Sequence, residues 1–530
     1  MNPLFATPLS RADLLALPDV PAGRSLRIAV HRNHSFELVA SVLNKFLGLS
    51  GIRSEFIYSG YDDSVSFADG VPDADVHLLW LDAARYAVAD FSAWLESRVL
   101  ALRARIRDGE GGDRILAACC GATGLDGMAL PDALFLECDA VVAPLGPNAY
   151  DLRLQEFSGT RLSNQACLTL ARELGARQIP AMLFPPLKAL VLDLDNTLYK
   201  GVLGEDGPEN VIPCPALQEH VAALGKQGFF LALASKNEEE DVRRLFALRK
   251  DFPLRWEDFT ASAIGWMPKS QGLESIAAAL RIGLDAMLFV DDNPGERLEV
   301  SRSLPETHVL PASDPDEMLA ALRFYPGLYK PRVSLEDSVR SVDLKANADR
   351  ERLRRRLSPE EYLAELDITF DFAVNRREQA ARIHELLHKT NQFVLALARP
   401  SQADVAAYLT GGGRCVVTVS MKDALSDSGL IAVSLFRRED AALRMDELAV
   451  SCRALGRGVE DGMIRAMLHC AATKLGAGPK VRIVYEQGPR NRPGREWLQS
   501  VSTKPLAASG VVELPHLPPE TLHSVRVRME

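Results

Sequence analysis

Residues 190–198 of the chain read Leu-Val-Leu-Asp-Leu-Asp-Asn-Thr-Leu, an apolar run that reaches Asp193 and Asp195, two acids one residue apart. Such a run predicts a buried strand that delivers carboxylates to the loop at its C-terminal end. That edge is where open parallel sheets bind their ligands. The same letters taken alone also fit a strand exit built from ordinary turn residues, and the later parts of the chain favour the first interpretation.

Two further apolar runs end in polar residues. Residues 229–235 (FFLALAS) end at Ser235, residues 286–290 (AMLFV) lead directly into Asp291, and between them Lys269 opens the helical pattern KSQGLESIAAAL. Two acids, a hydroxyl, a fixed cation and another acid, each near a strand or helix end, resemble the four motifs of the haloacid dehalogenase superfamily. The resemblance implies a Rossmann-like catalytic core.

These residue types suit phosphoryl chemistry. A phosphoryl group carries charge that must be neutralised before an anionic nucleophile approaches, and Mg²⁺ held by carboxylates is the usual means. The superfamily resemblance implies that Asp193 is the nucleophile that forms an aspartyl phosphate and that Asp195 is the general acid and base. Residue i+2 of an extended segment returns to the same face, so both acids can meet one substrate. By the same resemblance, Ser235 donates a hydrogen bond to the phosphate and Lys269 holds its charge.

The metal ligands follow from the same resemblance. We expect Asp193 and Asp291 to bind Mg²⁺ through their carboxylates and Asp195 to bind it through its backbone carbonyl. Four neighbouring polar residues are expected to support the site rather than to react: Asn196, Thr197, Asn237 and Asp292. For Asp292 a contact through water, an orienting role and a purely structural role all remain open.

Length and composition limit the class of protein. A chain of 530 residues is too long for one core and predicts several domains. The net charge of -10 argues against nucleic acid as a general partner. Eight scattered cysteines without metal-type spacing fit a reducing cytoplasm. No signal-peptide pattern and no run of about eighteen apolar residues is present, so we expect a cytoplasmic protein without a membrane span.

Residues 1–182 alternate strand-like runs with helical patterns. The runs include residues 26–30 (LRIAV) and 140–142 (AVV), and the alternation predicts a parallel sheet covered by helices. The region is weakly similar to SGNH-hydrolase domains. Polar residues gather after its first strand, namely His31, Asn33, His34 and Ser35. No G-x-S-x-G or GDS-type nucleophile turn accompanies them, so we expect a structural or binding role and not an independent hydrolase.

The resemblance narrows further along the chain. The runs KALVLDLDNTLYKGVLGEDG, LALASKNEEEDV, GWMPKSQGL and FVDDNPGERLEV are similar to the FkbH-like proteins, the subfamily IIIC branch of haloacid dehalogenase phosphatases. This resemblance implies a catalytic domain over residues 183–325, a helical linker over 326–364 and a GNAT-like acyltransferase domain over 365–505. Residues 506–530 would form a partly ordered tail.

Two signatures in the last third of the chain resemble the family's GNAT-like domain. They are HKTNQF at residues 388–393 and SCRALGRGVE at residues 451–460. A strand that leads into Arg453, Gly456 and Gly458 before a helix resembles the pyrophosphate loop of GNAT acyltransferases. Glycines let backbone amides approach a phosphate at a helix N-terminus, so we favour pantetheine or CoA binding over plain turn chemistry.

Three residues near these motifs have two interpretations each. Cys452 is a candidate acyl acceptor or a packed strand-end cysteine. Asn391 is a wall of an acyl site, as the family implies, or a helix C-cap. Cys214 is a thiol near the flap that follows the first motif, or an inert small residue.

The FkbH-like resemblance implies a reaction. These enzymes are understood to take the glyceryl group of 1,3-bisphosphoglycerate, remove phosphate and load the three-carbon unit onto the phosphopantetheine thiol of an acyl carrier protein for polyketide-type biosynthesis. We therefore expect a magnesium-dependent phosphatase and glyceryltransferase whose partners are a phosphorylated three-carbon donor and a carrier protein. Leu194 stands where many members carry Cys, which excludes an acyl-enzyme there. A stand-alone small-molecule phosphatase and a non-catalytic carrier-docking protein are the alternatives.

Overall fold

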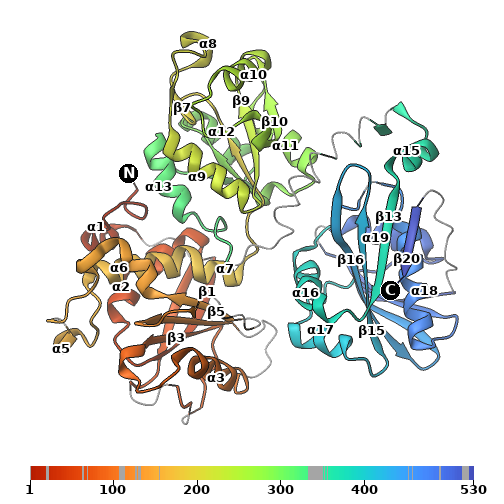
Figure 1. Cartoon of the computed structure of the whole chain (residues 1–530), viewed down its shortest axis with the longest axis horizontal. Coiled ribbons are helices and arrows are strands. Elements are labelled where there is room, and N and C mark those ends of the chain that lie inside the picture. The colour runs from red at the N-terminus through yellow and green to blue at the C-terminus, as the bar shows by residue number, and fades with distance from the viewer. Residues whose placement is uncertain are drawn as a thin grey trace. The chain divides into compact units, whose positions relative to one another are not determined.

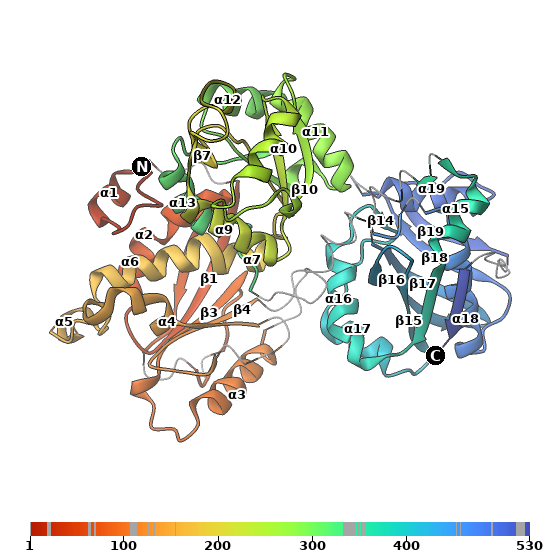
Figure 2. The same cartoon turned by 45° about the horizontal axis from the view of Figure 1, so that its top comes forward.

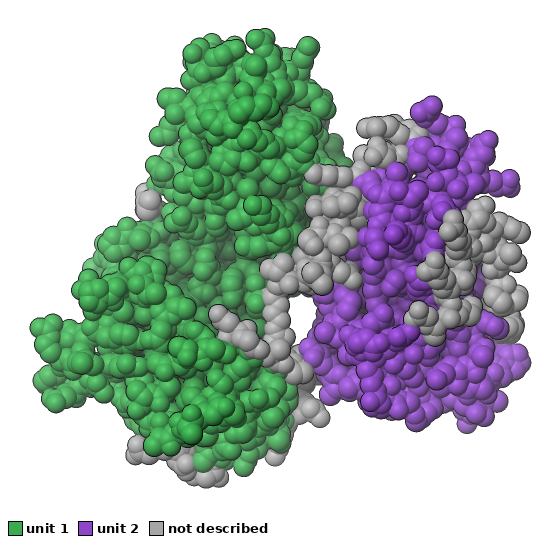
Figure 3. Space-filling view, viewed as in Figure 1, with its two compact units in different colours: residues 1–333 green, residues 334–530 purple. Residues whose placement is uncertain are grey.

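The structure is a computed structural model that divides the chain into two compact units, Met1–Val333 (unit 1) and Ser334–Glu530 (unit 2), coloured separately in Figure 3. It describes residues 2–18, 23–61, 65–67, 70–106, 114–125, 128, 130, 133–153, 155–331, 346, 350, 353–354, 356–451, 453–455, 457–488, 491–515 and 525–529. Both units combine sheets with helices, so the predicted multidomain α/β class is confirmed.

The first sheet of unit 1 has five parallel strands in the order β2-β1-β3-β4-β5. The strands are β2 (Ile52–Tyr58), β1 (Arg24–Arg32), β3 (Val76–Asp82), β4 (Ile115–Cys120) and β5 (Ala133–Glu137). Its helices are α1 (Arg11–Ala16), α2 (Glu37–Leu47), α3 (Phe91–Arg103), α4 (Cys138–Val142), α5 (Gln155–Ser158), α6 (Asn164–Glu173) and α7 (Ile179–Leu183).

Helices cover both faces of this sheet. Phe46 of α2 and Leu170 of α6 share one buried cluster with β1, whereas Val99 of α3 lies in a second cluster with β3 and β4. Figures 1 and 2 show α2 and α6 on one face and α3 on the other. Near-continuous apolar strands such as β3 are what a sheet buried on both faces requires.

One predicted strand is wrong. Residues 140–142 lie in the helix α4, and the fifth strand is β5, at residues 133–137. A short apolar run has no periodicity that separates a strand from one helical turn. The pairing of Leu134 with Leu116 on β4 decides where the strand lies, and that pairing is a long-range property.

The second sheet of unit 1 also has five parallel strands, in the order β10-β9-β6-β11-β12. The strands are β10 (Phe259–Ile264), β9 (Phe230–Ser235), β6 (Ala189–Leu192), β11 (Met287–Val290) and β12 (His308–Val309). Its helices are α8 (Leu203–Asp206), α9 (Pro215–Lys226), α10 (Glu239–Leu248), α11 (Lys269–Leu280), α12 (Pro294–Ser303) and α13 (Pro315–Phe324). The strand order reverses between β6 and β11, the point where such sheets bind ligands.

A short hairpin follows the first motif of this sheet. β7 (Tyr199–Lys200) pairs in antiparallel fashion with β8 (Ile212–Pro213), and only the four-residue helix α8 lies between them. The flap is therefore small. Phe46 of α2, which covers the first sheet, and Leu192 of β6 in the second sheet belong to one continuous buried cluster. The domain boundary proposed at residue 182 stays a prediction.

Unit 2 contains an eight-stranded sheet whose main path is β19-β18-β17-β16-β15-β13-β20, with β14 paired to β17 beside this path. The strands are β13 (Ile368–Val374), β14 (Phe393–Val394), β15 (Arg414–Lys422), β16 (Asp427–Glu439), β17 (Ala442–Val450), β18 (Val481–Glu486), β19 (Ser509–Leu514) and β20 (Val525–Met529). The helices are α15 (Pro359–Leu366), α16 (Ala380–Lys389), α17 (Gln402–Leu409), α18 (Glu460–Leu475) and α19 (Arg492–Val501).

The described parts of both ends of unit 2 form regular secondary structure. Ser358 caps α15 through a reciprocal capping box with Glu361. Within the expected partly ordered tail, residues 509–514 and 525–529 are the strands β19 and β20 of the sheet, and the tail boundary at residue 506 stays a prediction. Most of the expected linker helix between residues 332 and 355 lies outside the described residues. Across the described part of the chain, every helix is too short or too polar to cross a bilayer.

Candidate functional site

The first two acids of the site lie side by side because their strands are neighbours. Leu192, the last residue of β6, pairs with Val290, the last residue of β11. The next residues are Asp193 and Asp291, and the Asp193 N–H donates to the Val290 carbonyl at 2.9 Å. Parallel strands that end together therefore place both carboxylates at one edge of the sheet.

A third carboxylate joins them. Asp193, Asp291 and Asp292 each offer an oxygen, and these oxygens all lie within 4.8 Å of one another. Asp193 and Asp291 are buried, whereas Asp292 is half-buried. Burial raises the pKa of Asp193 and also that of Asp292, and the neighbouring Asp291 carboxylate raises both further. We call this set the carboxylate trio.

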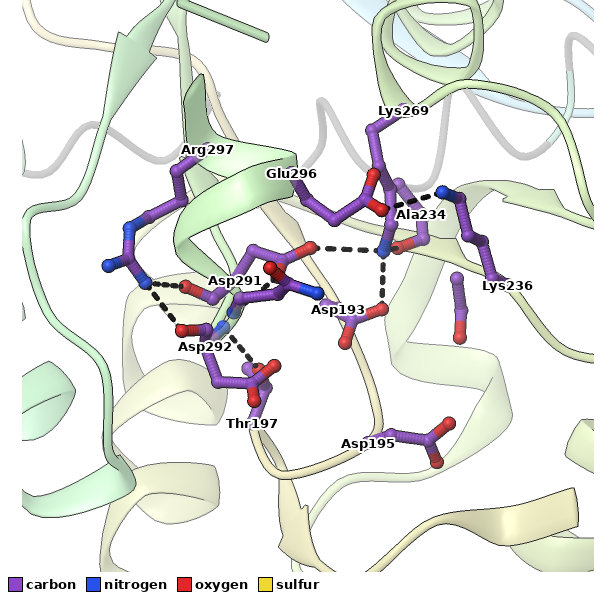
Figure 4. Close-up of polar contacts among 12 residues, drawn as sticks. Asp193, Asp195, Thr197, Ala234, Lys236, Lys269, Asp291, Asp292, Glu296 and Arg297 are labelled. Carbon is purple, nitrogen blue, oxygen red and sulfur yellow. Dashed lines mark hydrogen bonds and ion pairs between the residues drawn. The ribbon is translucent and has the colours of Figure 1, made fainter. Parts of the chain in front are cut away.

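Lys269 is the cation that faces the trio (Figure 4). Its Nζ lies 2.5 Å from Asp193 Oδ1 and 3.1 Å from Asp291 Oδ2, and it also donates to the Ala234 carbonyl at 2.5 Å. Burial acts to lower the pKa of Lys269, but the two carboxylates outweigh it and raise that pKa. Lys269 is the first residue of α11, so its ammonium lies at the strand edge, as the sequence predicts.

The trio fits a hard divalent cation. Among the described residues, Lys269 contacts the carboxylates of Asp193 and Asp291. The Arg297 guanidinium lies near Asp292. Three carboxylates therefore meet two cations, and negative charge is in excess. Mg²⁺ prefers carboxylate oxygens and is usually held by one or two of them together with substrate phosphate. Asp193 and Asp291, with Asp292 beside them, would hold such an ion.

Asp195 occupies a different position from the trio (Figure 4). Its Oδ1 accepts from the Tyr199 hydroxyl at 2.6 Å and from the Leu203 N–H at 2.9 Å, and its Oδ2 accepts from Asn237 Nδ2 at 2.9 Å. The flap, through Tyr199 and Leu203, and the loop after β9, through Asn237, thus fix this carboxylate. Binding of Mg²⁺ through the Asp195 carbonyl stays a prediction.

Ser235 and Asn237 form the next part of the site. Both are buried, and Asn237 Nδ2 donates to Ser235 Oγ at 3.0 Å as well as to Asp195. A chain of hydrogen bonds therefore runs from the end of β9 to the first motif. The Asn237 amide fixes the Ser235 oxygen near the strand edge, and the expected hydrogen bond from Ser235 to a phosphate stays a prediction.

Asn196 and Thr197 hold backbone and do not face the trio. Asn196 has φ 51° and accepts from the Gly201 N–H at 3.1 Å, which closes the loop at the base of the flap. Asn tolerates this left-handed conformation better than most residues. Thr197 Oγ1 accepts from the Asp292 N–H at 3.2 Å, so it links the loop after β6 to the loop after β11.

Two charged residues near the site were not predicted. Lys236 Nζ donates to Glu296 Oε1 at 2.6 Å, which links the loop after β9 to helix α12. Arg297 Nη1 donates to the carbonyls of Asp291 and Asp292, each at 2.7 Å. Figure 4 shows both contacts. A charged residue in a loop, such as Lys236, or in the first turn of a helix, such as Arg297, looks like ordinary surface in a sequence, so no sequence signal distinguished them.

An exposed tryptophan also stands at this edge. Trp266 is 72% exposed, yet its indole N–H donates to Glu238 Oε1 at 2.8 Å. The preceding residue, Gly265, donates its N–H to the Ser235 carbonyl at 3.0 Å. The loop that leads into Lys269 is therefore fixed against the loop that carries Ser235.

Cys214 lies at the start of α9, directly after β8. It is half-buried with a free thiol, and its N–H donates to the Leu198 carbonyl at 3.2 Å. Burial raises the pKa of this thiol, which disfavours the reactive thiolate. The thiol is close to the flap in sequence and structure, and a role as acyl acceptor stays a prediction.

The polar residues at the end of β1 each bond to a different residue of the first domain-like half of unit 1. His31 Nε2 lies 3.2 Å from His77 Nδ1, and His34 Nδ1 lies 3.0 Å from Thr160 Oγ1. Asn33 bonds to the backbone of Asp82, and Ser35 Oγ donates to Glu37 Oε2 at 2.5 Å. The four residues do not converge on one ligand position.

The predicted loop of unit 2 is described in part. Cys452 and Gly456 lie outside the described residues. Gly458 has φ 75°, a conformation that favours glycine. Arg453 is 5% exposed, with Nε 3.4 Å from Ser451 Oγ and Nη2 3.4 Å from the Leu430 carbonyl. Its guanidinium therefore contacts the domain interior, and phosphate binding by this loop stays a prediction.

Asn391 contacts a neighbouring arginine. Its Oδ1 accepts from Arg399 Nη2 at 2.7 Å, while Arg399 Nη1 donates to the Thr390 carbonyl at 2.9 Å. The side chain thus supports the turn that follows α16. Its proposed place in the wall of an acyl site stays a prediction.

The chain has little similarity to characterised proteins. No protein-family model and no curated protein matches it. Among solved structures it is similar to the N-terminal part of the protein BF1531 from Bacteroides fragilis, which contains a phosphatase domain complexed with Mg. The two chains share 21% identity, the match covers 59% of this chain and 96% of that chain, and the TM-score is 0.45.

Two acetyltransferases are also similar over about a quarter of this chain. A GNAT-family protein from Desulfovibrio desulfuricans shares 13% identity, with 27% of this chain and 96% of that chain covered and a TM-score of 0.22. The ribosomal-protein-S18-alanine N-acetyltransferase from Escherichia coli shares 11% identity, with 29% and 99% covered and a TM-score of 0.21.

Proposed function

We propose that the chain is a magnesium-dependent phosphoryl-processing enzyme whose active site is the carboxylate trio with Lys269. The observation that carries this proposal is the excess of negative charge at the strand edge, where three carboxylates meet and Lys269 and Arg297 are the nearby cations. Proteins rarely bury like charges together without a partner cation. A phosphorylated substrate with Mg²⁺ supplies both the cation and a phosphoryl group for the nucleophile.

The residues divide the work in the following way. Asp193 attacks the phosphorus, forming an aspartyl phosphate while the bond to the leaving group breaks. Asp195, held by Tyr199 and Asn237, donates a proton to an alkoxide leaving group and later takes one from the attacking water. Bound Mg²⁺ would neutralise the phosphoryl oxygens. Lys269 adds a fixed positive charge at the same edge.

The finer proposal concerns the substrate. The FkbH-like motifs support an acyl phosphate donor, 1,3-bisphosphoglycerate, and transfer of its glyceryl group to the thiol of an acyl carrier protein. Two phosphates leave the donor in that reaction. The C3 phosphate ester is cleaved by attack of Asp193 on its phosphorus and hydrolysis of the aspartyl phosphate. The C1 phosphate leaves when a sulfur–carbon bond forms, the acyl carbon–oxygen bond breaks and the thiol loses its proton. The small flap between β7 and β8 supports a protein-borne acceptor, since a short hairpin leaves more room than a large cap.

A second candidate is a stand-alone phosphatase for small esters. Leu194, fully buried between the two acids, offers no thiol for an acyl-enzyme at that position. The phosphatase reaction needs only the trio, Lys269 and the Asp195 network. A non-catalytic docking protein is the least supported alternative, because it gives no reason to keep buried acids together.

Intact-protein mass spectrometry separates these functions. Purified protein with Mg²⁺, 1,3-bisphosphoglycerate and its holo carrier protein should add one glyceryl mass to the carrier. The Asp193→Asn variant should abolish this addition. Phosphate release from many esters without any gain of mass by a carrier would favour the stand-alone phosphatase. If no phosphate is released and no carrier gains mass, an enzymatic function is contradicted.

A further inference from the structure

The central strand of unit 2 has two unlike edges. β17 pairs with β16 along its whole length, from Ala442 to Val450. On its other edge it pairs with β18 only from Leu443 to Met445, in parallel. Beyond Met445 the two strands no longer pair, so the backbone of residues 446–450 needs a different partner on that edge.

The chain's own residues fill this gap. Phe393 pairs with Val450 and Val394 with Ala449 in antiparallel register. The Leu395 N–H then donates to the Leu448 carbonyl at 3.1 Å, and the Leu395 carbonyl accepts from the Glu486 N–H at 2.9 Å. The segment 393–395 therefore bridges β17 and β18. We call residues 393–398 the inserted segment.

A buried carboxylate anchors the inserted segment. Glu447 of β17 is 2% exposed, and its carboxylate accepts backbone N–H bonds from Ala396 and Ala398 at 2.8 Å each and from Leu395 at 3.2 Å. These charge-assisted bonds exist only while the segment stays in place. If it left, a buried carboxylate would lose its donors, which is unfavourable.

Packing holds the same residues from the other side. Val394 and Leu395 are fully buried, and the Phe393 ring lies 6.4 Å from that of Trp497 on α19. A Cβ added to Gly494 would lie 3.0 Å from the Val394 carbonyl oxygen, so α19 approaches the segment at a residue without a side chain. The inserted segment is therefore part of the core of unit 2 and not a surface loop.

The position of this segment bears on ligand binding. The loop that includes Arg453 and Gly458 follows β17 directly. An extended, amide-bearing arm such as pantetheine, with its phosphate at this loop, would lie along β17 and bond to the backbone edge of residues 446–450. The inserted segment already occupies residues 448–450 of that edge.

We infer that residues 393–398 are a built-in strand that keeps this slot closed, so unit 2 does not accept the pantetheine arm of CoA along β17. Unit 2 then keeps an acyltransferase-like sheet but does not act as a CoA-dependent acyltransferase through this slot. The inference stands apart from the proposed phosphoryl chemistry, since it concerns other residues and a separate compact unit.

Hydrogen exchange on the full chain, read by mass spectrometry, tests the inference together with a CoA titration. The amides of Leu395, Ala396 and Ala398 should exchange roughly a hundredfold more slowly than those of the exposed glycine turn at residues 411–413. With about 1 mM CoA, a concentration that would reveal weak binding, this protection should not change and no saturable binding should appear. Saturable CoA binding that changes exchange in residues 393–398, or rapid exchange of these amides without CoA, would overturn the inference.

A matched pair of variants tests the anchor. Glu447→Gln should speed exchange at Ala396 and Ala398 by roughly tenfold, because the amide accepts more weakly than the carboxylate. Glu439→Gln, at the exposed end of β16 with ion pairs to Arg444 and Arg482, should leave these amides unchanged. Equal exchange in both variants would contradict the anchoring role of Glu447. If Glu447→Gln does not fold, the wild-type exchange and CoA titration still decide the question.

Discussion

The two sheets of unit 1 are built alike but treat their polar residues differently. Each has five parallel strands, and each places polar residues where the strand order reverses, after β1 and β3 in one sheet and after β6 and β11 in the other. In the first sheet the charges pair: Arg161 Nε and Nη2 donate to the Asp82 carboxylate at 2.9 and 3.0 Å. In the second sheet three carboxylates meet, and Lys269 and Arg297 are the nearby cations.

This difference separates a structural cluster from a candidate active site. Polar residues that meet at a sheet edge can satisfy one another and leave no charge for a ligand, as Asp82 and Arg161 do. Acids that meet with too few cations store unfavourable energy that a metal ion and an anionic substrate relieve together. Among the described residues, excess like charge therefore marks the second sheet more clearly than the presence of polar groups alone.

An Asp→Asn substitution should mainly lower activity in the second sheet and mainly lower stability in the first, and the effect on activity is the larger. Asp193→Asn should lower phosphate release from acetyl phosphate by about a thousandfold or more, because an amide cannot act as the nucleophile. Its free energy of unfolding without Mg²⁺ should change by only about 1 kcal/mol, since the lost ion pair with Lys269 is offset by reduced repulsion from Asp291. Full turnover by this variant would show that the site is assigned wrongly.

Asp82→Asn should damage stability instead. The substitution leaves the Arg161 guanidinium without its charged partner, and breaking a buried pair costs about 2 to 4 kcal/mol. Chemical denaturation should report this loss, while turnover per folded molecule should stay at the wild-type level. A large fall in turnover with unchanged stability would mean that the first sheet takes part in the chemistry.

Acid should also weaken the first sheet. Burial lowers the pKa of His31 and of His77 to about 4, and that of His34 to about 3. The unfolded chain binds protons on these rings below about pH 6.5 and the folded chain does not, so stability falls as the pH drops from about 6.5 towards 4.

Between about pH 7 and pH 5, each of these histidines should lower the free energy of unfolding by at most about 2 kcal/mol. Denaturation at both pH values should show a smaller loss for His77→Gln than for the wild type. An unchanged pH dependence in this variant would indicate that the ring is not kept neutral by the fold.

Much of the second sheet could be predicted from the sequence. Apolar runs gave the strands β6, β9 and β11, and residues directly after such runs must lie at the strand edge. Lys269 followed from its place at the first residue of a helical pattern. The local pattern and the tertiary structure agree here, because each motif needs only its own strand or helix to reach the edge.

Other features depend on contacts that no local pattern contains. Asp292 belongs to the carboxylate trio because of the backbone turn after Asp291, which the Thr197 hydroxyl helps to fix from 95 residues away in sequence. Glu447 looks like one polar residue in a strand, yet its role comes from the amides of residues 395–398. Long-range pairing decides such features, and one sequence does not display it.

Metal binding tests the central claim most directly. Calorimetric titration of the full chain with Mn²⁺, which takes the same oxygen ligands as Mg²⁺, should show one saturable site in the wild type. Asp291→Asn should weaken this binding roughly tenfold or more, and Asp82→Asn should leave it unchanged. Equal Mn²⁺ affinity in the wild type and Asp291→Asn, or no binding to the wild type, would contradict a metal site at the paired ends of β6 and β11.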